Sequence, residues 1–263
     1  MRTTFASSGA RSSPRADAFA EDGRIALFLD VDGTLLDLAE RPDEVTVPSG
    51  LVSDVAAAEA KAGGALALVS GRVIADLDRL FSPLRLRAAG VHGAELRLEP
   101  KDEPFASAES EALPPSLWGA LTDLLREFPG TFAENKRFSY AVHYRQAAGV
   151  GGVLRTRLTK LLETLSQPEI MMLEAHCAFE VKARQFDKGR AVTAFLSTPT
   201  FEGRTPIFIG DDHTDESGFA AVSARGGRGY SVGRLLRGAV DTFASPGEVR
   251  GWLAAFAASG ATA

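Results

Sequence analysis

Short apolar runs alternate with helical patterns along the first part of the chain. Residues 24–29 and 65–69 each hold a short run of apolar residues bounded by turn residues, which is typical of a buried strand. Between these runs, residues 48–63 place apolar side chains at helical spacing. A second helix is expected to end near residue 80, and a further strand is expected within 87–98. This β-α-β-α-β order predicts a parallel sheet.

The hydrophobic pattern changes in the middle of the chain. Residues 101–115 are acidic and contain three prolines, so we interpret them as a linker. Amphipathic helices are expected at 116–128 and 153–165. Alternating polar and apolar positions predict half-buried strands at 132–136, 138–144, 170–173 and 178–181. The middle block therefore combines helices with antiparallel strands, unlike the segments on either side.

After residue 182 the earlier pattern returns, with a helix at 188–196, a strand at 205–209 and a last helix at 249–258. We therefore predict an α/β protein whose core consists of two pieces with a cap domain inserted between them. The expected divisions are a disordered tail at 1–22, the core at 23–103 and 184–263, and the cap at 104–183. Hinges for cap movement are expected near 99–104 and 181–186.

Composition and charge exclude several classes of protein. The chain has 263 residues, of which 45% are hydrophobic, so it can bury a sizeable core. The net charge of −5 comes with no basic stripe, and we expect no nucleic-acid partner. The single cysteine, Cys177, excludes an internal disulfide. No apolar run is long enough to span a bilayer, and residues 1–22 lack the apolar segment of a secretory signal. We expect no membrane partner and take the cytoplasm as the default location; the sequence leaves the oligomeric state open, with a monomer among the alternatives.

The first candidate for chemistry follows the first predicted strand. Asp30 and Asp32 are two residues apart and lie on the same side of an extended chain. Two carboxylates this close repel each other, so their burial requires a cation or a proton. Gly33 allows a sharp turn and a close approach of the backbone to a ligand. A calcium loop would need further oxygen ligands after this motif, but the apolar residue Leu35 follows instead. The alternative without a ligand is a strand end with two solvated acids.

Further polar groups follow the other predicted strands or begin a predicted helix. They are Ser70, Lys188, Asp211, Asp212 and Asp215. In a doubly wound sheet, such groups converge at the carboxyl edge of the strands, where ligands bind. Each of them alone is compatible with a structural role. Their order after the Asp30 strand favours a common site.

This ordered set of motifs resembles the four motifs of the haloacid-dehalogenase-like (HAD) phosphatases. The sequence is more narrowly similar to the trehalose-6-phosphate phosphatases. The core motifs that carry the resemblance are D-V-D-G-T-L at 30–35, S-G-R at 70–72, V-H-G-A-E at 91–95, D-K-G at 187–189 and G-D-D-H-T-D-E at 210–216. The cap motifs are E-N-K at 134–136 with Ser139, H-Y-R at 143–145 and E-V at 180–181. The resemblance extends from residue 24 to the C-terminal helix.

The resemblance implies a Rossmann-like parallel sheet with an inserted α+β cap and a two-step phosphatase mechanism. It assigns Asp30 as the nucleophile that becomes phosphorylated and Asp32 as the general acid and base. Ser70 and Lys188 would hold the transferred phosphoryl oxygens. The implied reaction converts trehalose 6-phosphate and water to trehalose and phosphate, the last step of trehalose biosynthesis. The implied partner is therefore a small-molecule substrate.

A bound Mg²⁺ is the cofactor that the resemblance implies. Its expected ligands are the side chains of Asp30 and Asp211 and the backbone carbonyl of Asp32. Asp212 and Asp215 are expected at or just outside the coordination shell, where they would orient ligands and water.

The resemblance also implies a substrate-binding set, in which cap residues hydrogen-bond to sugar hydroxyls. The set comprises Gly71, Arg72, His92, Gly93, Glu134, Lys136, His143, Arg145 and Glu180. From the spacing alone, Glu134 and Lys136 are equally compatible with two exposed residues on one face of a strand. His143 and Arg145 are also compatible with pairing inside the cap.

The sequence departs from the family pattern at one position and leaves other functions open. The family usually has a basic residue and then proline after the cap glutamate, whereas here Ala183 follows Lys182. The missing proline removes a rigid turn at the link from cap to core. The alternatives are a related phosphatase for another sugar phosphate, a sensor that binds without hydrolysis, and a phosphotransferase or mutase. The presence of the motif residues argues against the sensor, and nothing in the sequence favours the phosphotransferase.

Overall fold

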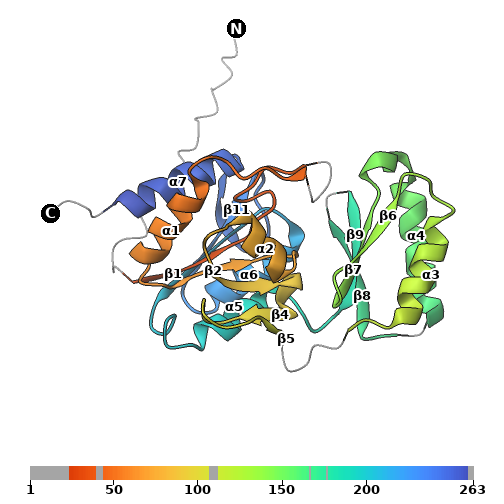
Figure 1. Cartoon of the computed structure of the whole chain (residues 1–263), viewed down its shortest axis with the longest axis horizontal. Helices are drawn as coiled ribbons and strands as arrows, with labels where there is room; N and C mark the ends of the chain where they lie inside the picture. The colour runs from red at the N-terminus through yellow and green to blue at the C-terminus, as the bar shows by residue number, and fades with distance from the viewer. Residues whose placement is uncertain (1–23, 40–43, 107–111, 166, 176, 260–263) are drawn as a thin grey trace, which may run out of the picture.

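The chain forms two lobes, each built on its own sheet (Figure 1). The computed structural model describes residues 24–39, 44–106, 112–165, 167–175 and 177–259. The tail expected at 1–22 lies outside the described residues. No helix in the described part of the chain is long and apolar enough to cross a membrane.

The larger sheet has eight strands in the order β12-β11-β10-β1-β2-β3-β4-β5. Its strands are β1 (Ile25–Leu29), β2 (Leu66–Val69), β3 (Arg87–Gly90), β4 (Glu95–Arg97), β5 (Phe105–Ala106), β10 (Thr205–Gly210), β11 (Arg228–Val232) and β12 (Ala239–Phe243). The pairs from β12 to β3 are parallel, and β4 and β5 extend the sheet in antiparallel fashion. The mostly parallel α/β core predicted from the sequence is confirmed.

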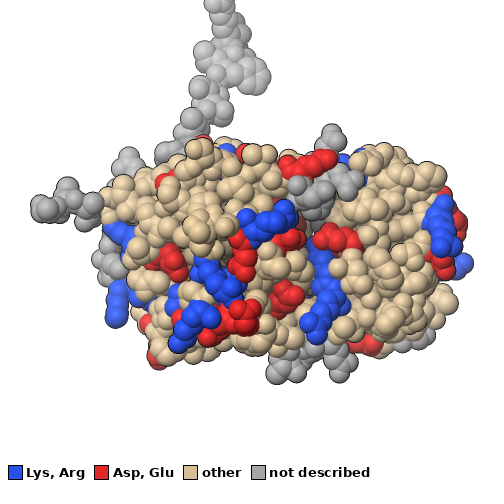
Figure 2. Space-filling model, in the orientation of Figure 1, with Lys and Arg blue, Asp and Glu red and all other residues tan. Residues whose placement is uncertain are grey.

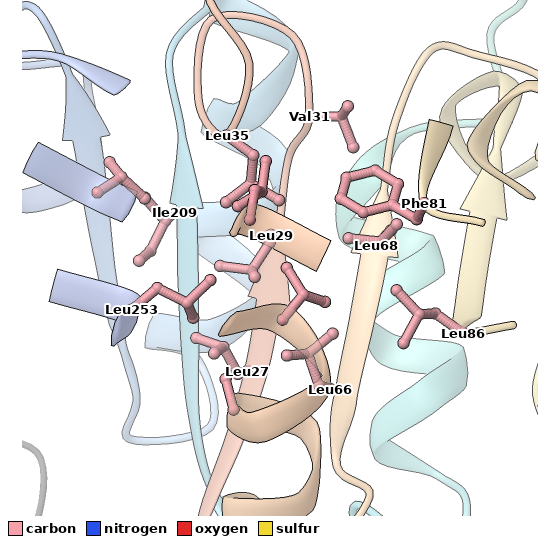
Figure 3. Packing of buried hydrophobic residues seen from close by; sticks show 14 of the residues in the cluster. Leu27, Leu29, Val31, Leu35, Leu66, Leu68, Phe81, Leu86, Ile209 and Leu253 are labelled. Carbon is pink, nitrogen blue, oxygen red and sulfur yellow. The ribbon is translucent and has the colours of Figure 1, made fainter. Parts of the chain in front are cut away.

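Helices cover both faces of the larger sheet. One face packs against α1 (Leu51–Lys61), α2 (Ile74–Leu80) and α7 (Pro246–Ala258), and the other packs against α5 (Lys188–Leu196) and α6 (Glu216–Ser223). All five residues of β1 are buried, because alternate side chains enter opposite layers. Leu27 and Leu29 enter the layer under α1 and α7 (Figure 3), whereas Ala26 and Phe28 enter the layer under α5.

The smaller sheet is antiparallel and has four strands in the order β6-β7-β9-β8. The strands are β6 (Phe132–Asn135), β7 (Ser139–His143), β8 (Ile170–Ala175) and β9 (Ala178–Ala183). Helices α3 (Pro115–Leu125) and α4 (Gly151–Leu165) pack on one face through a separate apolar cluster. Figure 1 shows both helices on the side away from the larger lobe, so the other face of this sheet is turned toward the core.

The structure corrects the sequence prediction at several places. Phe105 and Ala106 form β5 of the larger sheet, although the cap was expected to begin at residue 104. The segment 87–98 forms two antiparallel strands around the 3₁₀ turn η3 (Val91–Gly93) rather than one strand with a turn. The sequence pattern did not predict strands β11 and β12 or helix α6. All three elements are short; α6 and β11 contain Gly and Ser, and β12 contains Asp and Thr, so their hydrophobic periodicity is weak.

Candidate active site

The parallel register of the core strands brings the predicted polar residues to one edge. Strand β1 lies between β10 and β2, with Leu29 opposite both Ile209 and Leu68. The chain therefore leaves all three strands at the same edge of the sheet. The predicted side chains that follow the strands there are Asp30, Ser70 and Asp211. All three line a cavity of about 200 Å³ between the core and the cap.

Asp30 is buried among polar partners. Its Oδ1 accepts a hydrogen bond from Lys188 Nζ at 2.8 Å, and its Oδ2 accepts one from Thr34 Oγ1 at 3.3 Å. Burial raises the pKa of Asp30, and the charge of Lys188 opposes the rise. Lys188 reaches this position because α5 begins there, where the Asp187 side chain caps the helix by accepting from the Arg190 N–H at 2.8 Å.

Asp215 fixes the loop that follows β10. One carboxylate oxygen accepts from Lys188 Nζ at 2.6 Å, and the other accepts from the backbone N–H groups of Asp211 and Asp212, both at 3.0 Å. Gly210 is required here, because a Cβ atom at this position would lie 2.2 Å from the Asp215 carboxyl carbon. Asp215 is fully buried and orients its neighbours, so it occupies a supporting position behind the cavity.

The carboxylates of Asp30, Asp211 and Asp215 form a cluster that suits a divalent cation. One oxygen from each lies within 4.8 Å of the others. Burial, followed by the charges of Asp30 and Asp215, raises the pKa of Asp211 to about 9, so this side chain resists ionisation without a nearby cation. A Cβ atom on Gly33, where φ is 77°, would lie 2.1 Å from Asp211 Oδ2. Oxygen-only ligands of this kind match Mg²⁺.

Asp32 stands apart from this carboxylate cluster and pairs with Arg72. The guanidinium donates from Nε at 2.6 Å and from Nη2 at 2.7 Å to the two carboxylate oxygens. The backbone N–H of Arg72 donates to Ser70 Oγ at 3.1 Å. Arg72 was expected to bind substrate; it lines the cavity, and its guanidinium bonds the Asp32 carboxylate there.

Asp212 lines the cavity beside the carboxylate cluster. Its Oδ1 accepts from the backbone N–H of Thr214 at 2.7 Å and from Thr214 Oγ1 at 2.6 Å, and these bonds cap the 3₁₀ turn η5 (His213–Asp215). Burial raises the pKa of Asp212, but the charge of Lys188 and the bonds from Thr214 outweigh burial and lower it. Asp212 is therefore held as an anion at the cavity wall.

On the cap side, Glu134 and His143 form a pair across neighbouring strands. Glu134 Oε2 lies 3.0 Å from His143 Nε2, and the His143 ring stacks on Phe132 with 4.6 Å between ring centroids. Burial raises the pKa of Glu134, but the hydrogen bond with His143 and the charge of Lys136 outweigh burial and lower it. Glu134 therefore faces the cavity as an anion with about a third of its side chain exposed.

Glu180 is the most heavily engaged cap carboxylate. It accepts from Ser139 Oγ at 2.5 Å, lies 2.9 Å from His92 Nε2 and lies 3.8 Å from Lys136 Nζ. Burial raises its pKa, but the charges of Lys136 and His92 and the hydrogen bonds from His92 and Ser139 lower it well below its usual value. His92 reaches Glu180 from a left-handed backbone conformation with φ of 55°.

In the described part of the chain, polar contacts join the cap to the core around the cavity. Lys136 Nζ donates to the carbonyl oxygen of Gly71 at 3.1 Å, and Glu180 pairs with His92 as described above. Arg145 donates from Nη1 to the carbonyl oxygen of Ala39. Expected substrate-binding residues from cap and core thus meet one another across the cavity.

Gly93 is the exception among the expected binding residues, because it does not line the cavity. A Cβ atom there would lie 3.2 Å from Ala191, so Gly93 permits close packing against α5. Thr34 and Ser139 had no predicted role, although each donates a hydrogen bond to a predicted site carboxylate. Both residues belong to the motifs quoted above, and that position in the motifs could have identified them. The apolar lining residues Leu38, Val45 and Leu173 carry no comparable signal.

Comparisons with known proteins agree with this arrangement. The family model described as trehalose-phosphatase matches residues 28–238. The chain is 36% identical over 230 residues to trehalose-6-phosphate phosphatase of Escherichia coli (strain K12), covering 88% of this chain and 85% of that protein. It is 38% identical over 237 residues to a probable trehalose-phosphate phosphatase of Sinorhizobium fredii (strain NBRC 101917 / NGR234), covering 88% and 87%.

Solved structures show the same fold. The C-terminal domain of C. albicans trehalose-6-phosphate phosphatase superimposes with a TM-score of 0.83 at 18% identity, covering 92% of this chain and 95% of that one. A phosphatase of the HAD superfamily from Bacteroides thetaiotaomicron gives a TM-score of 0.59 at 16% identity, covering 94% and 97%. The family match and the fold agree with the site geometry, and the chain belongs to the trehalose-phosphatase family.

Proposed function

We propose that this protein hydrolyses trehalose 6-phosphate to trehalose and phosphate through a phosphorylated Asp30. The proposal rests on the family membership and on one geometric observation. Asp30 lies at the cavity wall with Lys188 2.8 Å away and Asp211 within the same carboxylate cluster, and the cap carboxylates line the same cavity. The proposed nucleophile, its cationic partner and the proposed hydroxyl-binding groups therefore share one cavity.

In the first step, an Asp30 oxygen attacks phosphorus and the bond from phosphorus to the sugar oxygen breaks. Asp32, in its protonated form, gives its proton to the departing sugar oxygen, so trehalose leaves as a neutral alcohol. In the second step, water attacks the phosphorus of the acyl phosphate while Asp32 takes a proton from that water. Phosphate leaves and the Asp30 carboxylate is restored. Lys188 and Ser70 hold the phosphoryl oxygens during both steps.

The carboxylates of Asp30 and Asp211 and the backbone carbonyl of Asp32 would hold Mg²⁺, which would neutralise the charge between the carboxylates and a dianionic phosphate. Asp215 supports this set, because it holds the backbone N–H groups at the start of the Asp211 loop. Asp212 is held by Thr214 at the side of the same loop.

Glu134, Lys136 and Glu180 would recognise the sugar through its hydroxyl groups. All three line the cavity from the cap side, opposite Asp30. Charged groups bound to hydroxyls discriminate strongly, because a substrate lacking the hydroxyl leaves a buried charge unpaired. Glu134 is the most accessible of the cap carboxylates described above, and we therefore assign it a direct contact with the sugar.

The test is a comparison of kcat/KM across trehalose 6-phosphate, sucrose 6′-phosphate, glucose 6-phosphate and a small aryl phosphate. We expect trehalose 6-phosphate to be preferred by about two orders of magnitude or more, the range open to hydroxyl recognition. Glu134→Ala should raise KM for trehalose 6-phosphate and change KM little for the aryl ester. Glu127→Ala, at an exposed cap position, is the matched control.

A different preferred sugar phosphate would overturn the substrate assignment and leave the phosphatase chemistry standing. Binding of trehalose 6-phosphate without any release of phosphate would instead identify a sensor.

A further inference from the structure

Arg72 is held rigidly against Asp32. Its guanidinium makes two parallel bonds, at 2.6 and 2.7 Å, to the two oxygens of that carboxylate. The backbone is fixed as well, because the Arg72 N–H donates to Ser70 Oγ at 3.1 Å and its carbonyl accepts from the Val91 N–H at 2.9 Å. A Cβ atom on Gly90 would lie 2.8 Å from this carbonyl oxygen. The Arg72 side chain is therefore held at both ends, by the hydrogen bonds of its backbone and by the bonds of its guanidinium to Asp32.

The Arg72 side chain is more deeply buried than the Asp32 side chain. The Arg72 side chain is 7% exposed, whereas the Asp32 side chain is 30% exposed. Both residues line the cavity, but the carboxylate presents the larger surface to it. A planar guanidinium that pairs through two donors fixes both the position and the plane of its carboxylate partner. This geometry favours support of Asp32 over direct contact of Arg72 with the sugar.

We propose that Arg72 is a positioning residue that holds the Asp32 carboxylate in the orientation required for proton transfer. The inference rests on the role proposed above for Asp32 in the phosphatase reaction. Proton transfer requires the acid or base to lie within hydrogen-bond reach of the reacting oxygen. Without the Arg72 fork, the Asp32 side chain would rotate among its rotamers at a partly exposed position. Turnover would fall while substrate binding remained.

The proposal predicts a particular kinetic pattern. Arg72→Ala should lower kcat for trehalose 6-phosphate about 10- to 100-fold, part of the range that acid–base catalysis supplies, and should leave KM within about threefold. Arg72→Lys should recover part of kcat, because one donor and the charge remain. The loss in kcat/KM should be smaller for an aryl phosphate, whose leaving group departs without a proton. Arg126→Ala, on the exposed cap surface, is the control for loss of an arginine.

A double-mutant cycle with Asp32→Ala is the decisive experiment, measured with the aryl phosphate so that all four proteins give a signal. If Arg72 acts through Asp32, adding Arg72→Ala to Asp32→Ala should change kcat by less than about twofold. Thermal unfolding of each variant verifies that the fold is retained.

If Arg72→Ala lowers kcat by the same factor in wild type and in Asp32→Ala, the inference is overturned and Arg72 contacts the substrate directly. A change in KM alone would lead to the same conclusion. Those results leave the proposed function intact. Full turnover of trehalose 6-phosphate by Asp32→Ala alone would overturn the role of Asp32 in the proposed function, and the Arg72 inference with it.

Discussion

The immediate partners of each site carboxylate set its charge and orientation. Glu134 and Glu180 are held as anions by neighbouring cations and hydrogen bonds, whereas burial raises the pKa of Asp211. The motifs predicted most of the polar residues that line the cavity. They did not predict that Arg72 would turn to Asp32, because the direction of a long side chain depends on which partners the fold supplies.

Glu180 provides a pH-dependent test at this scale. Burial raises its pKa, but the facing charges and the Ser139 hydrogen bond lower it overall, from an ordinary value of 4.5. The folded protein thus binds fewer protons at this group than the unfolded chain in the window below pH 4.5. Its stabilisation is present above that pH and is lost as the pH falls toward the folded-state pKa. The groups facing it are His92, Lys136, Lys182 and Glu134.

We therefore expect Glu180→Gln to lower the free energy of unfolding most at neutral pH, with the difference from wild type shrinking below pH 4.5. Urea unfolding measured between about pH 3 and pH 7, in steps of about one pH unit, gives this difference in the free energy of unfolding. Glu103→Gln removes a carboxylate whose side chain is 85% exposed and should show no such trend. A difference that is constant with pH would contradict the predicted ionic role of Glu180.

At the scale of elements, strong hydrophobic runs were predictable and short mixed segments were not. Strand β1 contains five buried apolar residues and was predicted within one residue. Strand β11 has the sequence R-G-Y-S-V, and its strand conformation depends on pairing with β10 and β12. Such tertiary pairing is invisible to local periodicity.

The link from cap to core contains an interaction that the sequence did not reveal. Lys182, at the end of β9, is buried and donates from Nζ to the carbonyl oxygens of Phe186 and, at 3.4 Å, Ala183. Phe186 also packs in a small apolar cluster with Val91 and Phe138. We infer that Lys182 stiffens the turn that links the cap to the core.

Lys182→Met should lower the free energy of unfolding by roughly 1–3 kcal/mol, because the Phe186 carbonyl loses its donor while the apolar stem is retained. Denaturation in urea measures this change. Lys101→Met, at an exposed position in the described part of the chain, is the control. If the buried and the exposed substitutions have the same effect, Lys182 does not stabilise the link.

At the scale of the whole molecule, function depends on two lobes meeting over one edge of a sheet. The cavity between them is about 200 Å³, below the range of about 300–1,000 Å³ usual for ligand pockets. We therefore expect the cap to open in order to admit a phosphorylated disaccharide, with hinges near 99–104 and 181–186 as predicted from the sequence.

On the face shown in Figure 2, acidic and basic side chains are interspersed over the larger lobe.

Binding of Mg²⁺ should stabilise the assembled core. At about 100 times its Kd, a ligand specific to the folded state adds about 2.7 kcal/mol, which thermal unfolding detects as a higher midpoint. Asp211→Asn should weaken this response, because it removes one carboxylate of the cluster. Asp102→Asn, at an exposed position outside the cluster, should not. An unchanged Mg²⁺ response in Asp211→Asn would remove Asp211 from the ligand set.

The central claim is that Asp30 is the nucleophile for trehalose 6-phosphate. Its most direct measurement is the rate of phosphate release from that substrate, with Mg²⁺ present, by wild type and by Asp30→Asn. We predict that Asp30→Asn loses at least about a thousandfold in kcat while thermal unfolding confirms a folded protein. A folded Asp30→Asn variant that releases phosphate at the wild-type rate would contradict the account.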